Sequence, residues 1–219
     1  MRNNSFLAPV LLAVIAVSAA FAQSESDYKV SLTDDYMGAV ITGYTGRTAV
    51  VRIPSVIQGM PVREIGSFKN NNVTSVVVPE GVNVIRANAF KSSMENRVSA
   101  NQRITMITLP NSLRRIEYMA FYNLHSLHTI VIPEGVTEIG DWAFAHCLNL
   151  TSVTFPSTIR KIGASAFFGC KSLTNITFNG QAQKIEFGDI DVFNSNLRDV
   201  KLLLSGQSLL RLRGYGGRF

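Results

Sequence analysis

The feature that most constrains this chain is a 23-residue period between residues 104 and 178. Three segments, 104–110, 127–133 and 150–156, share the pattern apolar-x-x-apolar-x-apolar-Pro, and their prolines are 23 residues apart. Other columns keep the same step: Ile116, Ile139 and Ile162, and the pairs Ala120-Phe121, Ala143-Phe144 and Ala166-Phe167. Several columns with one period predict a repeat solenoid, in which each unit forms one coil of a stack.

Each unit divides into a strand and a return segment. The segment L-x-x-V-x-F/I-P alternates inward and outward residues, and proline ends it because a ladder position needs its N–H. Parallel strands are therefore expected near 73–78, 104–109, 127–132, 150–155 and 173–178, forming a sheet on one face. The chain returns through I-G-x-x-A-F, expected as short β, 3-10 or helical turns. We expect one continuous stack of core phenylalanines: Phe90, Phe121, Phe144 and Phe167.

The glycine that follows the isoleucine suits a tight corner at Gly66, Gly140 and Gly163. Arg86 and Glu117 occupy the same phase in other units, so this corner does not strictly require a positive φ.

The chain begins with the features of a cleaved secretory signal. Arg2 precedes an apolar run from Phe6 to Phe21, and an Ala-Phe-Ala site ends at Ala22. The run is shorter than the roughly 20 residues that a membrane span needs. We expect residues 1–22 to be a signal peptide, and the mature protein to be secreted, periplasmic or at the cell surface.

The rest of the chain divides into a capped solenoid. Residues 23–53 do not match the repeat, yet their β-branched residues and glycines predict strands, as in a terminal coil that covers the core. Residues 54–202 form the repeat region, with a polar insertion at 91–103 that is expected to leave the coil as a loop. Residues 203–219 are interpreted as a C-terminal cap followed by a basic, glycine-rich tail.

Charge is concentrated at the C-terminal end. The net charge is +6, and residues 198–219 hold five basic side chains against one acidic one. These five are candidates for binding a polyanion: Arg198, Lys201, Arg211, Arg213 and Arg218. The nearly neutral body argues against nucleic acid as a partner.

The sequence contains no motif for catalysis, phosphate binding or a cofactor, so we expect a non-enzymatic protein without cofactor or metal. The histidines, His125, His128 and His146, have no patterned carboxylate or thiol partners. Cys147 and Cys170 are one period apart, and Leu124 occupies the same phase one unit earlier. This column favours two buried thiols; a disulfide between neighbouring coils is the alternative.

These residues resemble the BspA-type leucine-rich repeat. The resemblance rests on the 23-residue unit, on residues 144–150 with their cysteine (FAHCLNL), and on the opening segments 43–46 and 53–62. It covers about residues 38–202 and implies a leucine-rich-repeat solenoid in a secreted or surface protein, in several members an adhesin for host matrix proteins. It brings no catalytic residues. The insertion and the basic tail depart from the family pattern.

The outward strand positions are the candidate partner-binding surface. In three columns they are Thr105, His128, Thr151 and Thr174; Met106, Thr129, Ser152 and Asn175; and Thr108, Val131, Thr154 and Thr177. Ser75 is expected to begin the second column, and Lys201 to end the third. Threonine is a common exposed β residue, so this composition is also what a plain exposed sheet has. The binding interpretation is a Thr/Val-rich face for a protein or a glycan.

The sequence thus predicts an adhesin-like, non-enzymatic binding module. The alternative is an envelope-associated structural protein that its basic tail holds to anionic polymers.

Overall fold

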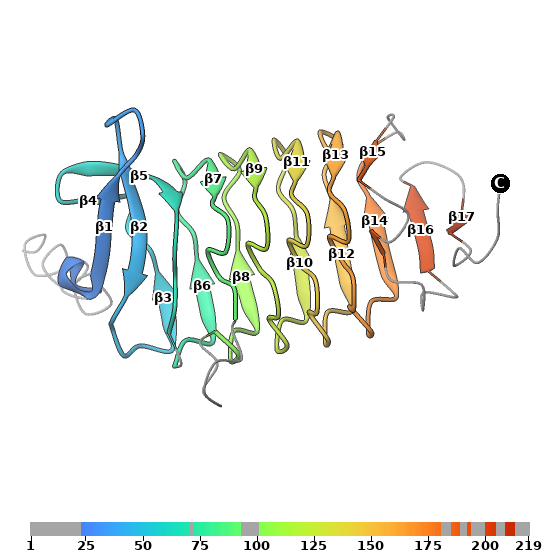
Figure 1. The fold of residues 1–219 in the computed structure, drawn as a ribbon, viewed down its shortest axis with the longest axis horizontal. Helices are drawn as coiled ribbons and strands as arrows, with labels where there is room; N and C mark the ends of the chain where they lie inside the picture. Colours follow the sequence, from blue (N-terminus) through green and yellow to red (C-terminus); the bar gives the residue numbers. More distant parts are fainter. Residues whose placement is uncertain are drawn as a thin grey trace, which may run out of the picture.

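The computed structural model describes residues 23–70, 72–92, 101–180, 185–188, 192–193, 200–204 and 209–212, the last two segments as backbone only. In this part the chain winds into a stack of coils, with successive strands side by side in sequence order (Figure 1). This confirms the predicted solenoid. One helical turn, η1 (Glu25–Asp27), occurs among these residues. The predicted signal peptide and the glycine-rich end of the tail lie outside them.

One series of parallel strands forms a long side of the solenoid. Its members are β3 (Val50–Arg52), β6 (Ser75–Val77), β8 (Met106–Thr108), β10 (Thr129–Val131), β12 (Ser152–Phe155), β14 (Asn175–Phe178) and β16 (Val200–Leu204). They pair in two parallel sheets, β3-β6-β8 and β10-β12-β14-β16, and β17 (Leu209–Leu212) adds to β16 antiparallel. The five predicted strands are confirmed, with shorter bounds.

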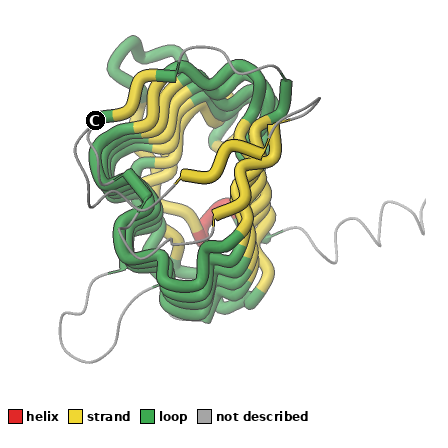
Figure 2. Tube along the Cα trace, turned by 90° about the vertical axis from the view of Figure 1, so that its right-hand side faces the viewer, coloured by secondary structure: helices red, strands yellow, loops and turns green. Residues whose placement is uncertain are grey.

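The return segments form a second sheet. Its repeat strands are β7 (Val84–Ile85), β9 (Arg115–Ile116), β11 (Glu138–Ile139), β13 (Lys161–Ile162) and β15 (Glu186–Phe187), all parallel. Each buries its last residue except β15, whose two residues are exposed. Viewed along the stack, the two series of strands lie on different sides of the coil, joined by loops (Figure 2). The expected short β segments of the return side are therefore a continuous sheet.

An N-terminal hairpin adds to the end of this second sheet. β1 (Tyr28–Leu32) and β2 (Ala39–Tyr44) form an antiparallel hairpin, and β2 pairs parallel with β5 (Met60–Ile65), which also pairs with the short β4 (Val56–Ile57). The hairpin ends the sheet beyond β5 and lies within residues 23–53, the segment for which a terminal cap is predicted.

A stack of aromatic rings runs through the core. Phe121 lies between Phe90 and Phe144, with ring centroids 5.3 and 4.9 Å away, and these pairs are nearly parallel. The predicted stack is confirmed, and it is longer than predicted. In chain order it contains Tyr28, Tyr44, Phe68, Phe90, Phe121, Phe144, Phe167 and Phe193.

Tyrosine replaces phenylalanine where the stack reaches the N-terminal end. The Tyr28 hydroxyl donates to Gln23 Oε1 at 2.7 Å, and the Tyr44 hydroxyl and Thr48 Oγ1 are 2.7 Å apart. Burial raises the pKa of Tyr28 well above its ordinary value, with smaller contributions from Tyr44 and Asp27. A phenol is suited to this position because its ring packs in the core while its hydroxyl finds a partner near the surface.

Glutamates tie neighbouring coils together at one row of turns. The Glu80 carboxylate accepts hydrogen bonds from the backbone N–H groups of Asn111 and Ser112, at 3.0 and 3.1 Å. Ser112 Oγ accepts from the Gly81 N–H at 2.9 Å and donates to the Val82 carbonyl at 2.7 Å. These bonds use backbone groups that a turn leaves unpaired.

The same arrangement recurs two coils later. Glu134 accepts from the N–H and hydroxyl of Ser157, at 3.2 and 3.0 Å, and the Gly135 N–H donates to Thr158 Oγ1 at 3.0 Å. Turns with the sequence Pro-Glu-Gly-Val, which supply the carboxylate, therefore alternate with turns that carry two polar residues. The second kind of turn donates hydrogen bonds to that carboxylate.

The glycine that recurs at the isoleucine–glycine corners reflects close contact between coils. Gly140 and Gly163 do not adopt a positive φ. A Cβ atom added at Gly140 would lie 2.7 Å from the backbone nitrogen of Tyr118, and one at Gly163 would collide with the backbone nitrogen of Asp141. Glycine at these corners therefore permits a close approach of the preceding coil.

The insertion is anchored at both ends. Asn101 is buried, donates to the carbonyl oxygens of Phe68 and Phe90, and accepts from the Asn70 N–H at 3.1 Å. Ser92, also buried, accepts a 2.7 Å hydrogen bond from the Gln102 amide at its hydroxyl. These bonds hold the positions where the chain leaves and rejoins the coil; residues 93–100 between them lie outside the described residues.

The two cysteines are free and buried, as the repeat column favoured. Each thiol donates to a carbonyl of the preceding coil: Cys147 Sγ to Phe121 O at 3.3 Å and Cys170 Sγ to Phe144 O at 3.1 Å. Burial raises the pKa of the Cys147 thiol well above its ordinary value, with a smaller contribution from Cys170. Both cysteines are therefore core residues.

Replacing a ring in the middle of the aromatic stack is expected to destabilise the whole solenoid. Phe144→Ala removes a fully buried side chain between two rings and leaves a cavity, so its free energy of unfolding should fall by about 3–5 kcal/mol. Phe187→Ala, at a half-exposed position on β15, is the matched control and should cost about 1 kcal/mol. Urea denaturation followed by circular dichroism measures both; equal losses would contradict the role of the stack.

The Glu80 contact predicts a pH dependence of stability. Hydrogen bonds from Asn111 and Ser112 lower the pKa of Glu80 below its ordinary value. A carboxylate with a lowered folded pKa stabilises the fold above its unfolded pKa, and this contribution disappears as pH falls through the folded value. The difference in urea midpoint between the wild type and Glu80→Gln should therefore be largest at neutral pH and shrink as the pH falls below the ordinary pKa of a glutamate, about 4.3.

Glu186→Gln is the control for this measurement, because Glu186 is exposed and no backbone partner for its carboxylate appears in the described part of the chain. A Glu80→Gln difference that stays constant from neutral pH to about pH 3 would contradict the proposed contact.

Candidate functional site

The predicted partner-binding residues lie on one face of the first series of strands. We call this surface the outer sheet face. It consists of Thr105, Met106, Thr108, His128, Thr129, Val131, Thr151, Ser152, Thr154, Thr174, Asn175 and Thr177. Every one of them is exposed or half-exposed, whereas the residues between them, such as Ile130 and Val153, are buried. The alternation predicted from the sequence is therefore correct in all four coils.

Parallel pairing aligns these residues in rows along the solenoid. Thr129 is in register with Ser152, and Val131 with Thr154. The next pair of strands continues both rows, to Asn175 and Thr177. Neighbouring strands in a sheet lie about 4.8 Å apart, so on β10, β12 and β14 the rows form a continuous surface. β8, which carries Met106 and Thr108, lies next to β10 but belongs to the sheet β3-β6-β8.

The row nearest the start of the strands has a structural role. The hydroxyls of Thr105 and Thr151 each donate, at 3.1 Å, to a carbonyl of the preceding coil, Thr74 O and His128 O respectively. Thr74 makes the same bond, at 3.2 Å, to Ala49 O. These hydroxyl protons are already used within the sheet. This leaves the second and third rows as the stronger candidates for partner contact.

The second and third rows combine exposed apolar side chains with short polar ones. Val131 is 65% exposed and Met106 is 54% exposed. Threonine, serine and asparagine surround them, and none of the residues of the outer sheet face carries a fixed charge. Protein interfaces have this character at their centre, where charged residues are depleted and methionine is enriched.

Two residues at the N-terminal end of the face differ from the sequence prediction. Ser75 is buried, because its neighbours in register, Val50 on β3 and Met106 on β8, are larger. Its Oγ has no hydrogen-bond partner among the described residues. Val50 is half-exposed and extends the face by one strand. Val50 was not recognised from the sequence, because the number of residues between it and its partner Ser75 differs from the 23-residue period.

The register at the C-terminal end also corrects the sequence alignment. β14 pairs with β16 so that Lys201 lies beside Asn175, and Leu203 beside Thr177. The third column was expected to end at Lys201, and the longer step of the last coil shifts this residue by two positions.

Five residues were predicted to bind a polyanion. Arg198, Arg213 and Arg218 lie outside the described residues. The backbones of Lys201 and Arg211 are paired between β16 and β17. Polyanion binding by this group remains a prediction.

The described residues hold no cluster of three or more histidine, cysteine, aspartate or glutamate side chains that would bind a metal ion. His128 is on the outer sheet face, whereas His125 and His146 lie in the turns that precede it. Burial lowers the pKa of His125, and the nearby His146 lowers it further. Within the described part of the chain, no helix is long and apolar enough to cross a membrane.

Stacked coils with a parallel sheet, a buried aromatic stack and an uncharged outer face define a leucine-rich-repeat solenoid of the kind that presents a binding surface. A family model described as the BspA type leucine rich repeat region matches residues 63–108 and 92–208 with six copies. The chain belongs to this family. No curated protein matches it at a significant level.

Two solved structures resemble the chain over most of its length. A leucine-rich repeat protein of T. pallidum is 28% identical, with 83% of this chain and 80% of that chain covered and a TM-score of 0.68. The pneumococcal vaccine antigen PcpA is 19% identical, with 84% and 44% covered and a TM-score of 0.59, which shows the fold alone. This chain covers less than half of that antigen.

Membership of the family suggests a protein-binding role at a surface. Leucine-rich-repeat proteins generally bind other proteins, and this family is typically non-enzymatic. The geometry above places the predicted contact residues on one continuous face, which is the arrangement such a role needs.

Proposed function

We propose that the protein is a non-enzymatic, adhesin-like binding module, secreted or held at the cell surface after cleavage near Ala22, which engages a partner protein through the outer sheet face. The observation that carries the proposal is the exposure of Met106 and Val131 among short polar side chains in a face without fixed charge. An exposed apolar surface with a polar surround is typical of a protein-interaction site.

The second and third rows are the centre of the proposed interface. Apart from Met106, their side chains are short or β-branched and are held by the sheet, so little conformational entropy is lost when a partner covers them. The third row repeats threonine or valine at the spacing of the strands, and the second row is mixed, which suits a partner with an extended surface. A flat surface of this kind gains affinity from the area it buries and from exclusion of water around Met106 and Val131.

The basic tail supplies the competing hypothesis, attachment to an anionic envelope polymer. The two differ in their physical basis. Exposed charges act over a Debye length of about 8 Å at physiological ionic strength and about 3 Å at 1 M salt. Contacts of desolvated threonine, valine and methionine do not depend on ionic strength in this way.

Binding of the mature protein to immobilised extracellular-matrix proteins tests the proposal. Replacing Thr129 and Thr154 together by Lys places unpaired charge in the interface, so affinity should fall by at least about tenfold, equivalent to about 1.4 kcal/mol. Thr137→Lys makes the same change at an exposed position beside the second sheet and should leave affinity unchanged. Deletion of residues 205–219 and transfer to 1 M NaCl should also have little effect.

Surface plasmon resonance measures these affinities, and thermal unfolding confirms that each variant is folded. Affinity that disappears with the tail or in high salt, and that is indifferent to the two lysines, would establish the tail hypothesis instead. Absence of binding to any matrix protein would contradict the adhesin-like role.

A further inference from the structure

A second surface of the solenoid holds a cluster of partly exposed aromatic side chains. The ring of His146 lies between those of Tyr122 and Phe168, edge-to-face with both, at centroid distances of 5.5 Å. The rings of Trp142 and Phe168 are tilted against each other, with their centroids 5.6 Å apart. We call these four residues the aromatic cluster. They belong to three consecutive units, and all four residues are partly buried and partly exposed.

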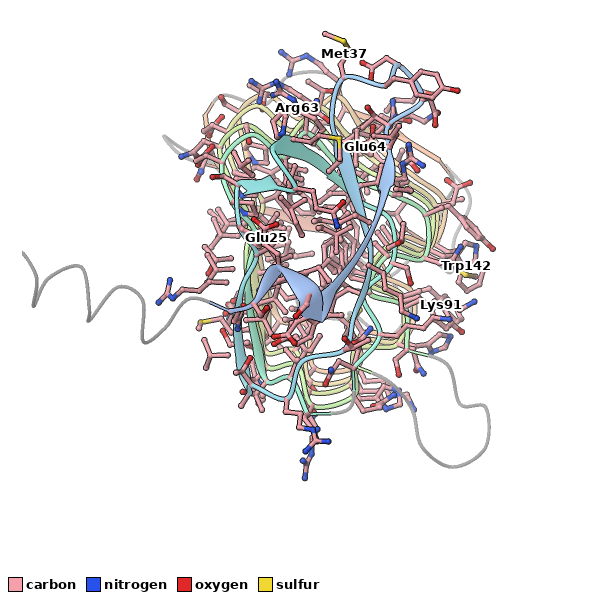
Figure 3. The ribbon with its side chains drawn as sticks, turned by 90° about the vertical axis from the view of Figure 1, so that its left-hand side faces the viewer. Glu25, Met37, Arg63, Glu64, Lys91 and Trp142 are labelled. Atoms are coloured by element: carbon pink, nitrogen blue, oxygen red, sulfur yellow. The ribbon has the colours of Figure 1, made fainter. Side chains whose placement is uncertain are left out.

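The cluster lies away from the outer sheet face. Its residues come from the turns of the return side, between the second sheet and the next strand of the first series. Figure 3, a view along the stack, shows Trp142 and Lys91 on the same side of the coil. The Lys91 Nζ lies 5.5 Å from the centre of the Tyr122 ring, so this lysine borders the cluster.

The backbone at the cluster is in a conformation that bulky residues rarely adopt. Trp142 has φ 58° and His146 has φ 60°, both left-handed. The same two positions of other units are also left-handed, and they hold Asn88, Met119 and Ser165 in the first case and Asn123 and Gly169 in the second. Asparagine and glycine adopt this region readily, whereas a large aromatic residue does so at a cost. The coil 133–155 therefore holds a tryptophan where its neighbours mostly have smaller residues and where a large aromatic residue is unfavourable, whereas histidine, like asparagine, is enriched in this region.

Packing around the cluster accommodates the imidazole specifically. A Cβ atom at Gly169 would lie 2.6 Å from His146 Nδ1. Glycine here is not required by the backbone alone, because Asn123 and His146 adopt a positive φ at the same position of the two preceding units. The absence of a side chain at Gly169 leaves room for the ring of His146. The next coil therefore has the small residue that packing against His146 requires.

The polar groups bordering the cluster indicate which chemistry fits it. The indole N–H of Trp142, the Tyr122 hydroxyl and the His146 ring nitrogens offer donors and acceptors. Lys91 adds one positive charge and the exposed Asp141 one negative charge, with Asp141 Oδ1 already accepting from the Ala164 N–H at 2.8 Å. The balance of charge favours neither a polyanion nor a polycation, and a purely apolar protein segment would leave these groups unsatisfied.

We propose that the aromatic cluster binds a neutral polysaccharide, an extended chain of β-linked hexoses of gluco configuration. Such sugar rings have apolar C–H faces, which pack on aromatic side chains, and equatorial hydroxyls, which hydrogen-bond at their edges. The cluster extends along the solenoid over three consecutive units, so an extended ligand can contact all of it, with the aromatic surfaces and the polar ring edges presented at different angles. Tyrosine and tryptophan serve this role because each combines a large apolar surface with a polar group.

The repeat itself supplies well-matched test variants. Trp142→Asn, His146→Asn and Phe168→Ala each introduce the residue that the same position holds in another unit, namely Asn88, Asn123 and Ala145. Each replacement is therefore compatible with the local backbone. Tyr36→Ala, which removes an aromatic side chain that is 76% exposed at the tip of the β1–β2 hairpin, is the control outside the cluster.

The experiment uses a water-soluble β-glucan and a hexamer of β-linked N-acetylglucosamine, with α-linked dextran, heparin and phosphatidylcholine vesicles for comparison. Trp142 is the only tryptophan of the chain, so its fluorescence reports directly on the cluster in the wild type. We expect a β-linked ligand to shift and intensify this emission, and calorimetry to show at least about tenfold weaker binding in Trp142→Asn and Phe168→Ala. Tyr36→Ala and the Thr129→Lys, Thr154→Lys protein should bind the sugar as the wild type does.

The outcomes separate this proposal from the function proposed above. Sugar binding that is lost in the cluster variants and kept in the lysine protein supports the aromatic cluster, whatever the result with matrix proteins. Binding of neither β-linked ligand overturns it, as does binding that survives Trp142→Asn and Phe168→Ala. A fluorescence change with vesicles but not with sugars would overturn the proposal and indicate that the cluster binds a lipid surface. A change with heparin alone would also overturn it and indicate binding of a polyanion by basic residues.

Discussion

Each coil of this protein contacts only the coils before and after it, so every inward side chain must fit its counterpart one unit away. This is the constraint on which the rest of the structure depends. It is satisfied most strictly in the aromatic stack, where the rings from Tyr44 to Phe167 succeed each other at 4.9–5.3 Å. A ring of another shape at any level would disturb two contacts at once. The sheets on both sides of the coil then follow, because coils in register bring their strands to hydrogen-bonding distance.

The same constraint explains how far the sequence alone predicts the structure. Columns such as Ile116 and Phe121 repeat because both neighbours of each coil demand the same residue, and a repeated residue is visible in a sequence. The strands, the buried rings, the free thiols and the outward rows were predictable for this reason. The buried Ser75 and the shifted register of Lys201 were not, because they arise where the spacing departs from 23 residues and a single column no longer indicates its neighbour. Turn contacts such as that of Glu80 involve polar residues that alternate and do not repeat.

The two proposed surfaces differ in how the repeat produces them. On the outer sheet face, a common β residue recurs, and a surface is formed from near-identical elements. At the aromatic cluster, by contrast, Trp142 replaces residues that mostly suit this backbone better in other units. The first surface was visible as a pattern and the second only as a departure from one. Both follow from a scaffold that leaves outward positions free while the core is constrained.

The alternation of the glutamate turns gives this solenoid a structural unit of two coils. A Pro-Glu-Gly-Val turn at 79–82 meets a turn at 110–113 that donates hydrogen bonds to its carboxylate, and the turn at 133–136 meets another such turn at 156–159. A chain that gained or lost a single coil within this region would bring two turns of the same kind together, with either two carboxylates or none between them. Duplication avoids this mismatch only when coils are added in pairs. The turn contacts of this part of the molecule therefore repeat every two coils, although its sequence period is one coil.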